Sequence, residues 1–174
     1  MNTGEIARDP YAFCPAFEQG WKQIRQEYLR IQDYLKGYED KHLYNQGWDL
    51  FGLWGIRHSI KSEAYELPLN TKWCPFTANL IRSHVPNNGA VFFSRLSAGT
   101  VIKPHRGVRA GSYRMHLGLI VPEGDIGLQV LGYPDPVRWR EGQLMIFDDN
   151  EEHEAWNHTD QDRVILIVDF FPDK

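Results

Sequence analysis

Two histidines in the second half of the chain occupy positions typical of metal ligands. His105 lies at the end of the apolar run at 100–105, and His153 follows the apolar run at 143–148. Neutral imidazoles are common ligands for divalent first-row metals. A single histidine after a strand is more often exposed or hydrogen-bonded than bound to a metal. Each of the two therefore needs support from its neighbours in the sequence.

Basic side chains accompany the two histidines. Arg163 opens the apolar run at 163–171, and Arg114 and His116 lie two residues apart within the run at 113–121. An inward-facing arginine near a metal suits a dicarboxylate, because guanidinium pairs with a carboxylate through two hydrogen bonds. Two histidines with such an arginine indicate an iron oxygenase that uses 2-oxoglutarate as co-substrate.

Strand alternation places Arg114 and His116 on one face of their run, beside Gly118, which we expect to leave space there. The opposite face is apolar. If the basic face looks into a barrel, its charges need an anion. The alternative is a solvent-exposed face, which is common in antiparallel sheets.

Acidic residues surround the second histidine. Asp148 and Asp149 precede His153, with Glu151, Glu152 and Glu154 close by. Such crowding attracts a cation, but it is also typical of a solvated acidic loop in which the aspartates form a turn.

The elements that must position these residues are mostly strands. Apolar residues from Trp21 to Leu35 recur at three- and four-residue steps and predict a helix that ends near Gly37. A second helix is predicted to start at Pro75, and the segment at 48–55 is a candidate strand. After a turn at 86–89, strands are expected near 90–97, 100–105, 113–121, 126–132, 143–148 and 163–171. This order predicts a mainly β sandwich or barrel of the jelly-roll kind with helices on one face.

Length and composition predict one domain, with a mixed part at 1–86 and a β core that holds the site at 87–174. The 174 residues are 42% hydrophobic and 13% aromatic, enough for a sizeable core. A net charge of −4 excludes a typical nucleic-acid surface. Without a visible signal peptide, a long apolar run or a cysteine framework around Cys14 and Cys74, we expect a cytoplasmic protein with no membrane partner. The oligomeric state is left open.

The stretch from Ser94 to Asp169 resembles the aspartyl/asparaginyl β-hydroxylase family of iron(II)- and 2-oxoglutarate-dependent oxygenases. The matching pieces are Pro104-His105, Arg114-Met115-His116-Leu117-Gly118-Leu119, Val121-Pro122, Trp139, Glu141-Gly142, Phe147-Asp148-Asp149, His153-Glu154, Trp156-Asn157, Arg163 and Ile167-Val168-Asp169. Before residue 87 the match is weak and rests mainly on Gly47-Trp48 and Leu53-Trp54.

The resemblance implies a double-stranded β-helix, cupin-like, around iron(II). It makes His105 and His153 the metal ligands and, with Arg114, the catalytic residues. It places Arg163 and Ser94 on the distal carboxylate of 2-oxoglutarate. It places Arg114 and His116 near the end of the co-substrate that chelates iron, or near the substrate. Trp48 would form a wall of this co-substrate site. Asp148 and Asp149 are then outside the metal's ligand set.

One position departs from most iron oxygenases of this broad type, which add a carboxylate ligand two residues after the first histidine. Here that residue is Gly107, and the family is known for lacking the carboxylate. The resemblance therefore implies that water takes this position. An aspartate introduced by Gly107→Asp is expected to reach the metal.

The substrate is less defined. Ser112 stands where many family members carry a second arginine that holds an acidic substrate, and Phe171 interrupts the usual His-Pro after the last strand. We expect hydroxylation of an aspartyl or asparaginyl side chain, another amino acid or a small peptide, with molecular oxygen consumed. The lack of a membrane anchor weighs against a lipid. The alternatives are a cupin-like metal protein of another activity and a non-catalytic module.

Overall fold

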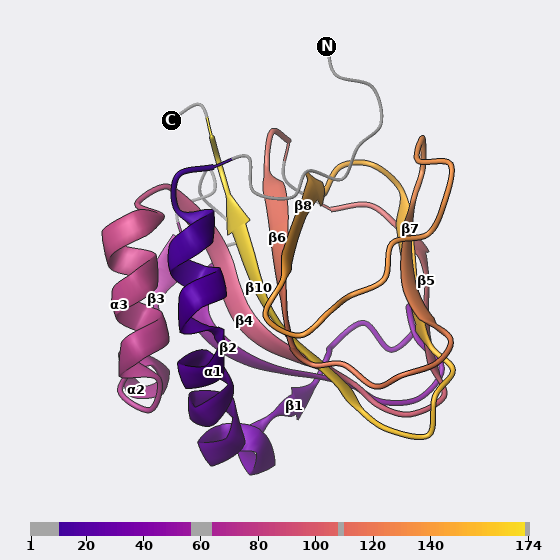
Figure 1. Ribbon diagram of the computed structural model, residues 1–174, viewed down its shortest axis with the longest axis horizontal. Helices are drawn as coiled ribbons and strands as arrows, with labels where there is room; N and C mark the ends of the chain where they lie inside the picture. Colours follow the sequence, from indigo (N-terminus) through magenta and orange to yellow (C-terminus); the bar gives the residue numbers. More distant parts are fainter. Residues whose placement is uncertain (1–10, 57–63, 108–109, 173–174) are drawn as a thin grey trace.

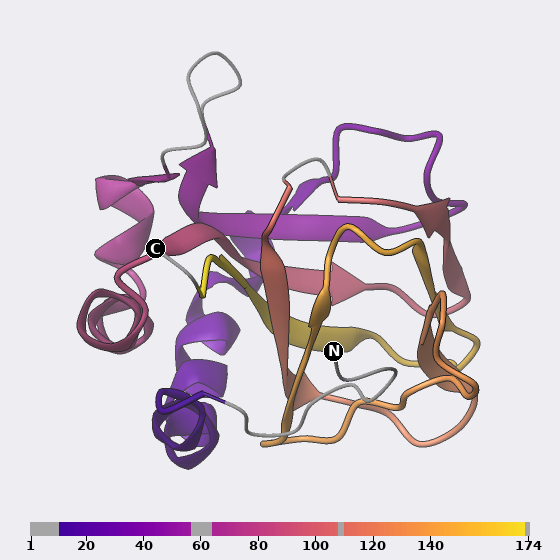
Figure 2. The ribbon, with the colours of Figure 1, turned by 90° about the horizontal axis from the view of Figure 1, so that it is seen from above.

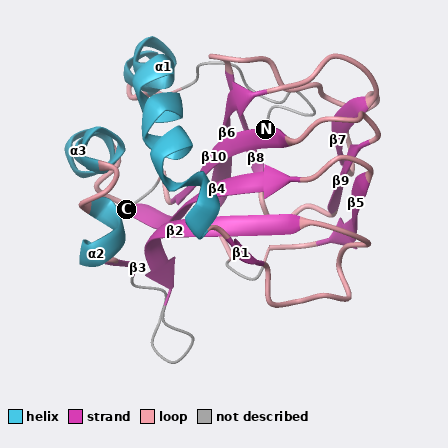
Figure 3. Cartoon of the chain, turned by 90° about the horizontal axis from the view of Figure 1, so that it is seen from below, coloured by secondary structure: helices cyan, strands magenta, loops and turns pink. Residues whose placement is uncertain are grey.

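The computed structural model describes residues 11–56, 64–107 and 110–172, which form three layers (Figure 1). A layer of helices covers one face of a seven-stranded sheet, and a three-stranded sheet covers part of the other face (Figure 3). The large sheet has the order β1-β2-β4-β10-β6-β8, with β3 paired to β2, and the small sheet has the order β5-β9-β7. The view from above shows the small sheet on the side away from the helices (Figure 2). This arrangement is a jelly-roll double-stranded β-helix with helices on one face, as the sequence predicts.

The elements follow the chain in this order: α1 (Cys14–Ile31), a 3-10 turn η1 (Gln32–Tyr34), β1 (Lys36–Gly37), β2 (Trp48–Ile56), β3 (Ala64–Glu66), α2 (Pro68–Thr71), α3 (Pro75–His84), β4 (Asn88–Leu96), β5 (Thr100–His105), β6 (Tyr113–Ile120), β7 (Ile126–Val130), β8 (Leu144–Asp148), β9 (His153–Asn157) and β10 (Arg163–Phe170).

The helices follow the apolar periodicity, with one difference in length. Helix α3 begins at Pro75, as predicted. Helix α1 ends at Ile31, six residues before the predicted end at Gly37. The chain there tightens into η1 and then extends, because Lys36 and Gly37 pair with β2 as strand β1.

All six strands predicted after residue 86 are present, and the segment at 48–55 is part of β2. The sequence analysis missed β9, which begins at His153 and pairs with both β5 and β7. This strand has only five residues and follows a run of acidic residues, so its pattern was not recognised. Within it His153, Ala155 and Asn157 are buried. The interpretation of His153 as part of a solvated loop is therefore wrong.

Two cores lie on the two faces of the large sheet. The outer core, between the helices and the sheet, includes Phe17, Ile24, Phe93, Leu117 and Leu166. The inner core, between the two sheets, includes Trp48, Ile102, Trp139, Phe147 and Ile165. No helix in the described part of the chain is long and apolar enough to cross a membrane.

Strand β10 separates the two cores, and every one of its residues is buried. Val164, Leu166, Val168 and Phe170 belong to the outer core, while Ile165 and Ile167 belong to the inner core. Strand alternation therefore places Arg163 and Asp169 on the inner face as well. The strand carries its only two charged residues into the space between the sheets.

Candidate active site between the two sheets

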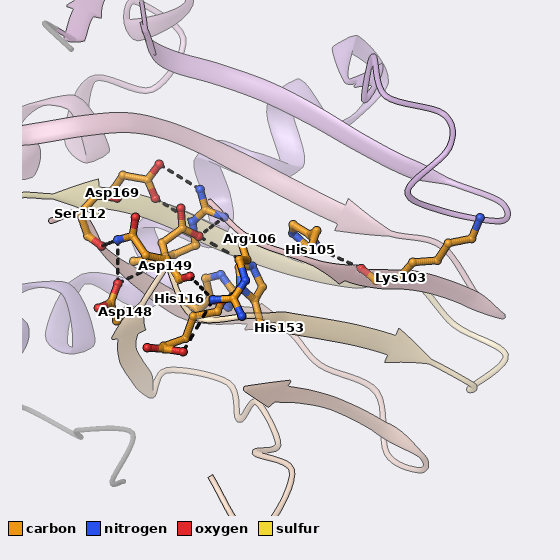
Figure 4. Close-up of polar contacts among 12 residues, drawn as sticks. Lys103, His105, Arg106, Ser112, His116, Asp148, Asp149, His153 and Asp169 are labelled. Atoms are coloured by element: carbon orange, nitrogen blue, oxygen red, sulfur yellow. Dashed lines mark hydrogen bonds and ion pairs between the residues drawn. The ribbon is translucent and has the colours of Figure 1, made fainter. Parts of the chain in front are cut away.

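His105 and His153 face each other across a pair of antiparallel strands. They are partners in the register of β5 and β9, and their ring centroids are 4.3 Å apart. Figure 4 shows them close together, with Lys103 farther along β5. Each ring places Nδ1 2.8 Å from the carbonyl oxygen two residues earlier, Lys103 for His105 and Glu151 for His153. A carbonyl can only accept, so each Nδ1 carries the proton and each Nε2 keeps its lone pair.

Both imidazoles are held in the neutral form that binds metals. Burial lowers the pKa of His105, and burial lowers the pKa of His153 to about 3. In the described part of the chain, no group of three or more His, Cys, Asp or Glu side chains is arranged to hold a metal. The protein therefore offers a metal two nitrogen ligands here. Hydrogen bonds from Nδ1 orient such ligands in many metal sites.

Arg163 is a buried cation that has no carboxylate partner in the part of the chain that the structure describes. Only 2% of the residue is exposed. Its Nη2 lies 3.5 Å from Ser94 Oγ, its guanidinium carbon lies 4.6 Å from the Trp139 ring centroid, and its Nε has no hydrogen-bond partner. Burial lowers the pKa of Arg163 to about 9. Burial of a charge with so few compensating contacts costs free energy, so this position favours the binding of an anion.

His116 also carries an unused polar atom on this inner face. Trp139 Nε1 donates a hydrogen bond to His116 Nδ1 at 3.2 Å. Since that nitrogen accepts, the proton of the neutral ring lies on Nε2, which is buried and has no partner. The pKa of His116 is held well below its usual value, first by burial and then by the nearby Arg114 and Arg163. The solvent-exposed interpretation of this face of β6 is wrong, since His116 is 5% exposed.

Gly118 does not leave the open space that the alternation pattern predicts. A Cβ there would lie 2.2 Å from the carbonyl oxygen of Arg140. The backbones are joined by hydrogen bonds from Gly118 N to Gln143 O and from Gly142 N to Gly118 O. The glycine allows the segment at 139–143 to pass against β6.

Arg114 is enclosed by carboxylates. Its Nε and Nη2 donate to the two oxygens of Asp169, its register partner, at 2.7 and 3.0 Å. Its Nη1 lies 2.7 Å from Asp149 Oδ1. Although burial opposes its charge, Asp169 and Asp149 raise the pKa of Arg114. Burial raises the pKa of Asp149 to about 6, against the pull of Arg114. Asp149 Oδ1 in turn lies 3.7 Å from His153 Nε2, so this network ends beside the histidine pair.

Gly107 lies against Asp149, which changes the expectation for a substituted carboxylate. Its N–H donates to Asp149 O at 2.7 Å, and a Cβ there would lie 1.9 Å from Asp149 Oδ2. That an aspartate introduced here reaches the metal stays a prediction, but its side chain would first have to displace Asp149, because that carboxylate fills the space next to Gly107.

The remaining predicted residues line the same space. Ser94 is 1% exposed and accepts a hydrogen bond from Trp48 Nε1 at 3.1 Å. The Trp48 ring lies 6.3 Å from the His105 ring, as expected of a wall beside the histidines. Asp148 lies at the end of β8 and bonds Asn150 rather than the histidines. The structure thus brings all predicted site residues between the two sheets.

Two residues of this site were given no site role in the sequence analysis, where they served only as pieces of the family resemblance. Trp139, in the connection between β7 and β8, contacts both Arg163 and His116. Asp169 holds Arg114. The alternation of β10 was a usable signal for Asp169, since a charged residue six positions after an inward Arg163 must share its face. No periodic signal pointed to Trp139.

Solved structures of similar fold include a member of the 2OG-Fe(II) oxygenase family. An oxidoreductase of the 2OG-Fe(II) oxygenase family from Burkholderia pseudomallei has a TM-score of 0.58 at 10% identity and covers 98% of this chain and 96% of its own. HygX from Streptomyces hygroscopicus, with nickel and 2-oxoglutarate bound, has a TM-score of 0.58 at 10% identity, with 87% and 79% covered. A Pseudomonas putida prolyl-4-hydroxylase gives 0.57 at 14% identity, with 90% and 88% covered. At these identities the similarity shows the fold.

Relatives in sequence are hydroxylases. The ornithine lipid ester-linked acyl 2-hydroxylase of Rhizobium tropici is 42% identical over 123 residues, which are 71% of this chain and 41% of the relative. The aspartyl/asparaginyl beta-hydroxylase of Mus musculus is 33% identical over 158 residues, 88% of this chain and 21% of the relative. The chain thus spans less than half the length of these relatives. The aspartyl/asparaginyl beta-hydroxylase family model matches residues 18–172. The chain belongs to the aspartyl/asparaginyl beta-hydroxylase family.

Proposed function

We propose that this protein is an iron(II)- and 2-oxoglutarate-dependent hydroxylase. The observation that carries the proposal is the buried Arg163, whose guanidinium has no carboxylate partner among the described residues. It lies in the same inter-sheet space as a pair of neutral histidines whose Nε2 atoms keep their lone pairs. A metal beside a buried cation is the arrangement that a chelating dicarboxylate requires.

His105 and His153 fit iron(II) as ligands. Their Nδ1 hydrogen bonds fix both rings, and two protein ligands leave room on the metal for the co-substrate, water and oxygen. When bound, iron and 2-oxoglutarate supply the oxidising chemistry: oxygen is reduced, the keto acid becomes succinate and carbon dioxide, and a substrate carbon–hydrogen bond becomes carbon–hydroxyl.

The protein's part is to bind and orient the co-substrate. Arg163 and the Ser94 hydroxyl would hold its distal carboxylate, and the unpaired Nε2–H of His116 would donate to another of its oxygens. Trp48 fixes the Ser94 hydroxyl through its indole N–H and closes the wall beside His105. Water is excluded by the apolar side chains of the inner core.

For Arg114 we propose a role different from the one that the resemblance implies. Three of its nitrogens are engaged by Asp169 and Asp149, so it is poorly placed to pair with a carboxylate of the co-substrate. We assign it as a positioning residue that holds the Asp149 carboxylate close to His153. There the carboxylate would be close enough to the metal ligands to accept a hydrogen bond from a metal-bound water.

For the substrate, the family supports an aspartyl or asparaginyl side chain, another amino acid or a small peptide. The competing class is an ester-linked acyl chain, since the Rhizobium tropici relative is named for an ornithine lipid. The engagement of Arg114 by Asp169 and Asp149 removes one arginine that could have paired with an acidic substrate.

The direct test is succinate formation from 2-oxoglutarate by the purified protein with added iron(II) and oxygen. We expect iron-dependent succinate, stimulated by the true substrate when aspartyl peptides, free amino acids and ornithine lipids are compared. An absence of succinate, while the protein binds iron and remains folded, would contradict the oxygenase assignment.

A further inference from the structure

Trp139 contacts both Arg163 and His116. It is 3% exposed and belongs to the inner core. Its place in the chain is outside the strands, in the connection that leads to β8. The close approach at Gly118 brings this connection against β6, two residues from His116.

The first contact fixes the proton on His116. Indole Nε1–H can only donate, so its 3.2 Å hydrogen bond to His116 Nδ1 requires a lone pair there. A neutral imidazole has one proton, which must then lie on Nε2. The result is a buried donor with no partner, ready to meet an acceptor oxygen.

The second contact fixes Arg163. The guanidinium carbon lies 4.6 Å from the centroid of the Trp139 ring. An aromatic face stabilises a desolvated cation without neutralising it or occupying its donors. Arg163 therefore keeps its charge and its N–H groups available for an anion.

We propose that Trp139 is a positioning residue for 2-oxoglutarate: one indole sets the tautomer of His116 with its N–H and supports Arg163 with its ring, so that both donors are ready for the same co-substrate. The inference rests on the proposed function. It adds a residue that acts through Arg163 and His116 and so determines how tightly the co-substrate binds.

The test separates the two contacts with two substitutions. Trp139→Phe keeps a ring beneath Arg163 and removes the N–H, whereas Trp139→Leu removes both. Affinity for 2-oxoglutarate is measured by calorimetry on the manganese(II)-loaded protein. We expect about a fivefold weaker affinity for Trp139→Phe, the effect of one neutral hydrogen bond. For Trp139→Leu we expect about a tenfold further loss, since the desolvated cation loses its aromatic support.

Nuclear magnetic resonance gives a readout independent of activity. Nitrogen-15 shifts of His116 should report a proton on Nε2 alone in the wild type and a mixture of tautomers in Trp139→Phe. In a His116→Ala background, Trp139→Phe should cause no further loss of affinity. Trp156→Phe is the matched control, because it removes a tryptophan N–H that bonds Asp125 at 2.7 Å, away from the site. It should bind 2-oxoglutarate as the wild type does.

Four results would overturn the inference. These are wild-type affinity in Trp139→Phe, an unchanged His116 tautomer, equal losses with and without His116, or equal affinities of the Phe and Leu variants. Failure of the proposed function gives a different result, because the wild type itself would then not bind 2-oxoglutarate. If the wild type binds 2-oxoglutarate and Arg163→Met does not, the proposed function is supported. The results for the Trp139 variants then decide the role of Trp139 separately.

Discussion

The outer and inner cores of this protein each bury charged side chains, but they treat them differently. In the outer core, Glu27 of α1 is 1% exposed and accepts three hydrogen bonds from the start of α3. The donors are Phe76 N at 2.7 Å, Thr77 N at 2.9 Å and Thr77 Oγ1 at 2.6 Å. This carboxylate satisfies the unpaired N–H groups that begin a helix and suits the positive end of its dipole.

In the inner core, Arg163 and His116 are as deeply buried and yet each has an unpaired N–H. Native proteins pair nearly all buried polar groups, so such exceptions call for an explanation. Both exceptions lie on the inner face of the large sheet, where Ser94, next to Arg163, accepts a hydrogen bond from the Trp48 that packs near His105. From the comparison we infer that Glu27 in the outer core serves the fold, whereas Arg163 and His116 in the inner core serve the ligand that we propose.

The largest effect is expected at the histidine pair. His105→Ala and His153→Ala each remove one of two protein ligands, so iron-dependent succinate formation should fall by at least about a thousandfold. Iron binding, measured by calorimetry, should weaken together with activity. His158→Ala, which changes an exposed histidine paired with Asp125, is the control and should retain both. A His105→Ala enzyme working at full rate would refute the metal assignment.

Glu27→Ala should destabilise the fold by about 3 to 5 kcal/mol, because it leaves several buried donors without their charged acceptor. Glu27→Gln keeps one acceptor oxygen and should cost about half as much. Urea unfolding measures both changes. Succinate formation per folded molecule should be unchanged, and a selective loss of activity would mean that the two cores are not functionally separate.

Gly107→Ala should destabilise the protein by about 2 to 3 kcal/mol, the upper range for overpacking, because its Cβ would collide with Asp149. Displacement of that carboxylate from His153 should also slow turnover. The double variant Gly107→Ala/Asp149→Ala removes the side-chain collision and should recover part of the lost stability. Equal stability of the wild type and Gly107→Ala would show that Asp149 lies elsewhere.

Removal of a buried charge should change the free energy of unfolding in opposite directions in the two cores. Arg163→Met replaces an unpaired buried cation by an apolar side chain of similar length, so the ligand-free protein should become about 1 to 2 kcal/mol more stable. Urea unfolding without 2-oxoglutarate measures this. A loss of stability as large as that of Glu27→Ala would mean that Arg163 serves the fold.

The smallest effect concerns pH. The folded pKa of Arg163 is lowered to about 9, so its cation is lost as the pH rises through that value. The fraction charged falls about fourfold between pH 8 and 9.5, and the affinity for 2-oxoglutarate should fall by the same factor. The stability of the ligand-free protein should change with pH in the opposite direction. Above about pH 9 the unfolded chain keeps the proton that folded Arg163 has lost, so the free energy of unfolding rises with pH. Arg163→Met should abolish both trends.

The sequence predicted much of this arrangement because alternation and periodicity reflect the nearest neighbours in a strand or helix. Alternation placed Arg114 and His116 on one face of β6 but left open whether that face is buried. The start of α3 at Pro75 was predicted from the preference of proline for the first turn of a helix. A polar residue on the apolar face of α1 was a further available signal, since Glu27 lies three residues after Ile24 and four before Ile31.

What the sequence could not supply are contacts between segments that only the folded backbone brings together. Gly107 and Gly118 carry no sign of the atoms packed against them, and Trp139 reaches the site through a connection with no periodic pattern. Strand β9 was missed because its five residues follow an acidic turn. Such features depend on chain path, which local propensity does not determine.

The most direct test of the ligand role of the inner core is to measure the unfolding free energy of the manganese(II)-loaded wild type and of manganese(II)-loaded Arg163→Met at increasing concentrations of 2-oxoglutarate. A ligand that binds only the folded state stabilises it by RT ln(1 + [L]/Kd), about 2.7 kcal/mol at a hundredfold excess over Kd. We predict this gain for the wild type and none for Arg163→Met, although the variant starts from the higher stability. Equal gains in the two proteins, or no gain in either, would contradict the account.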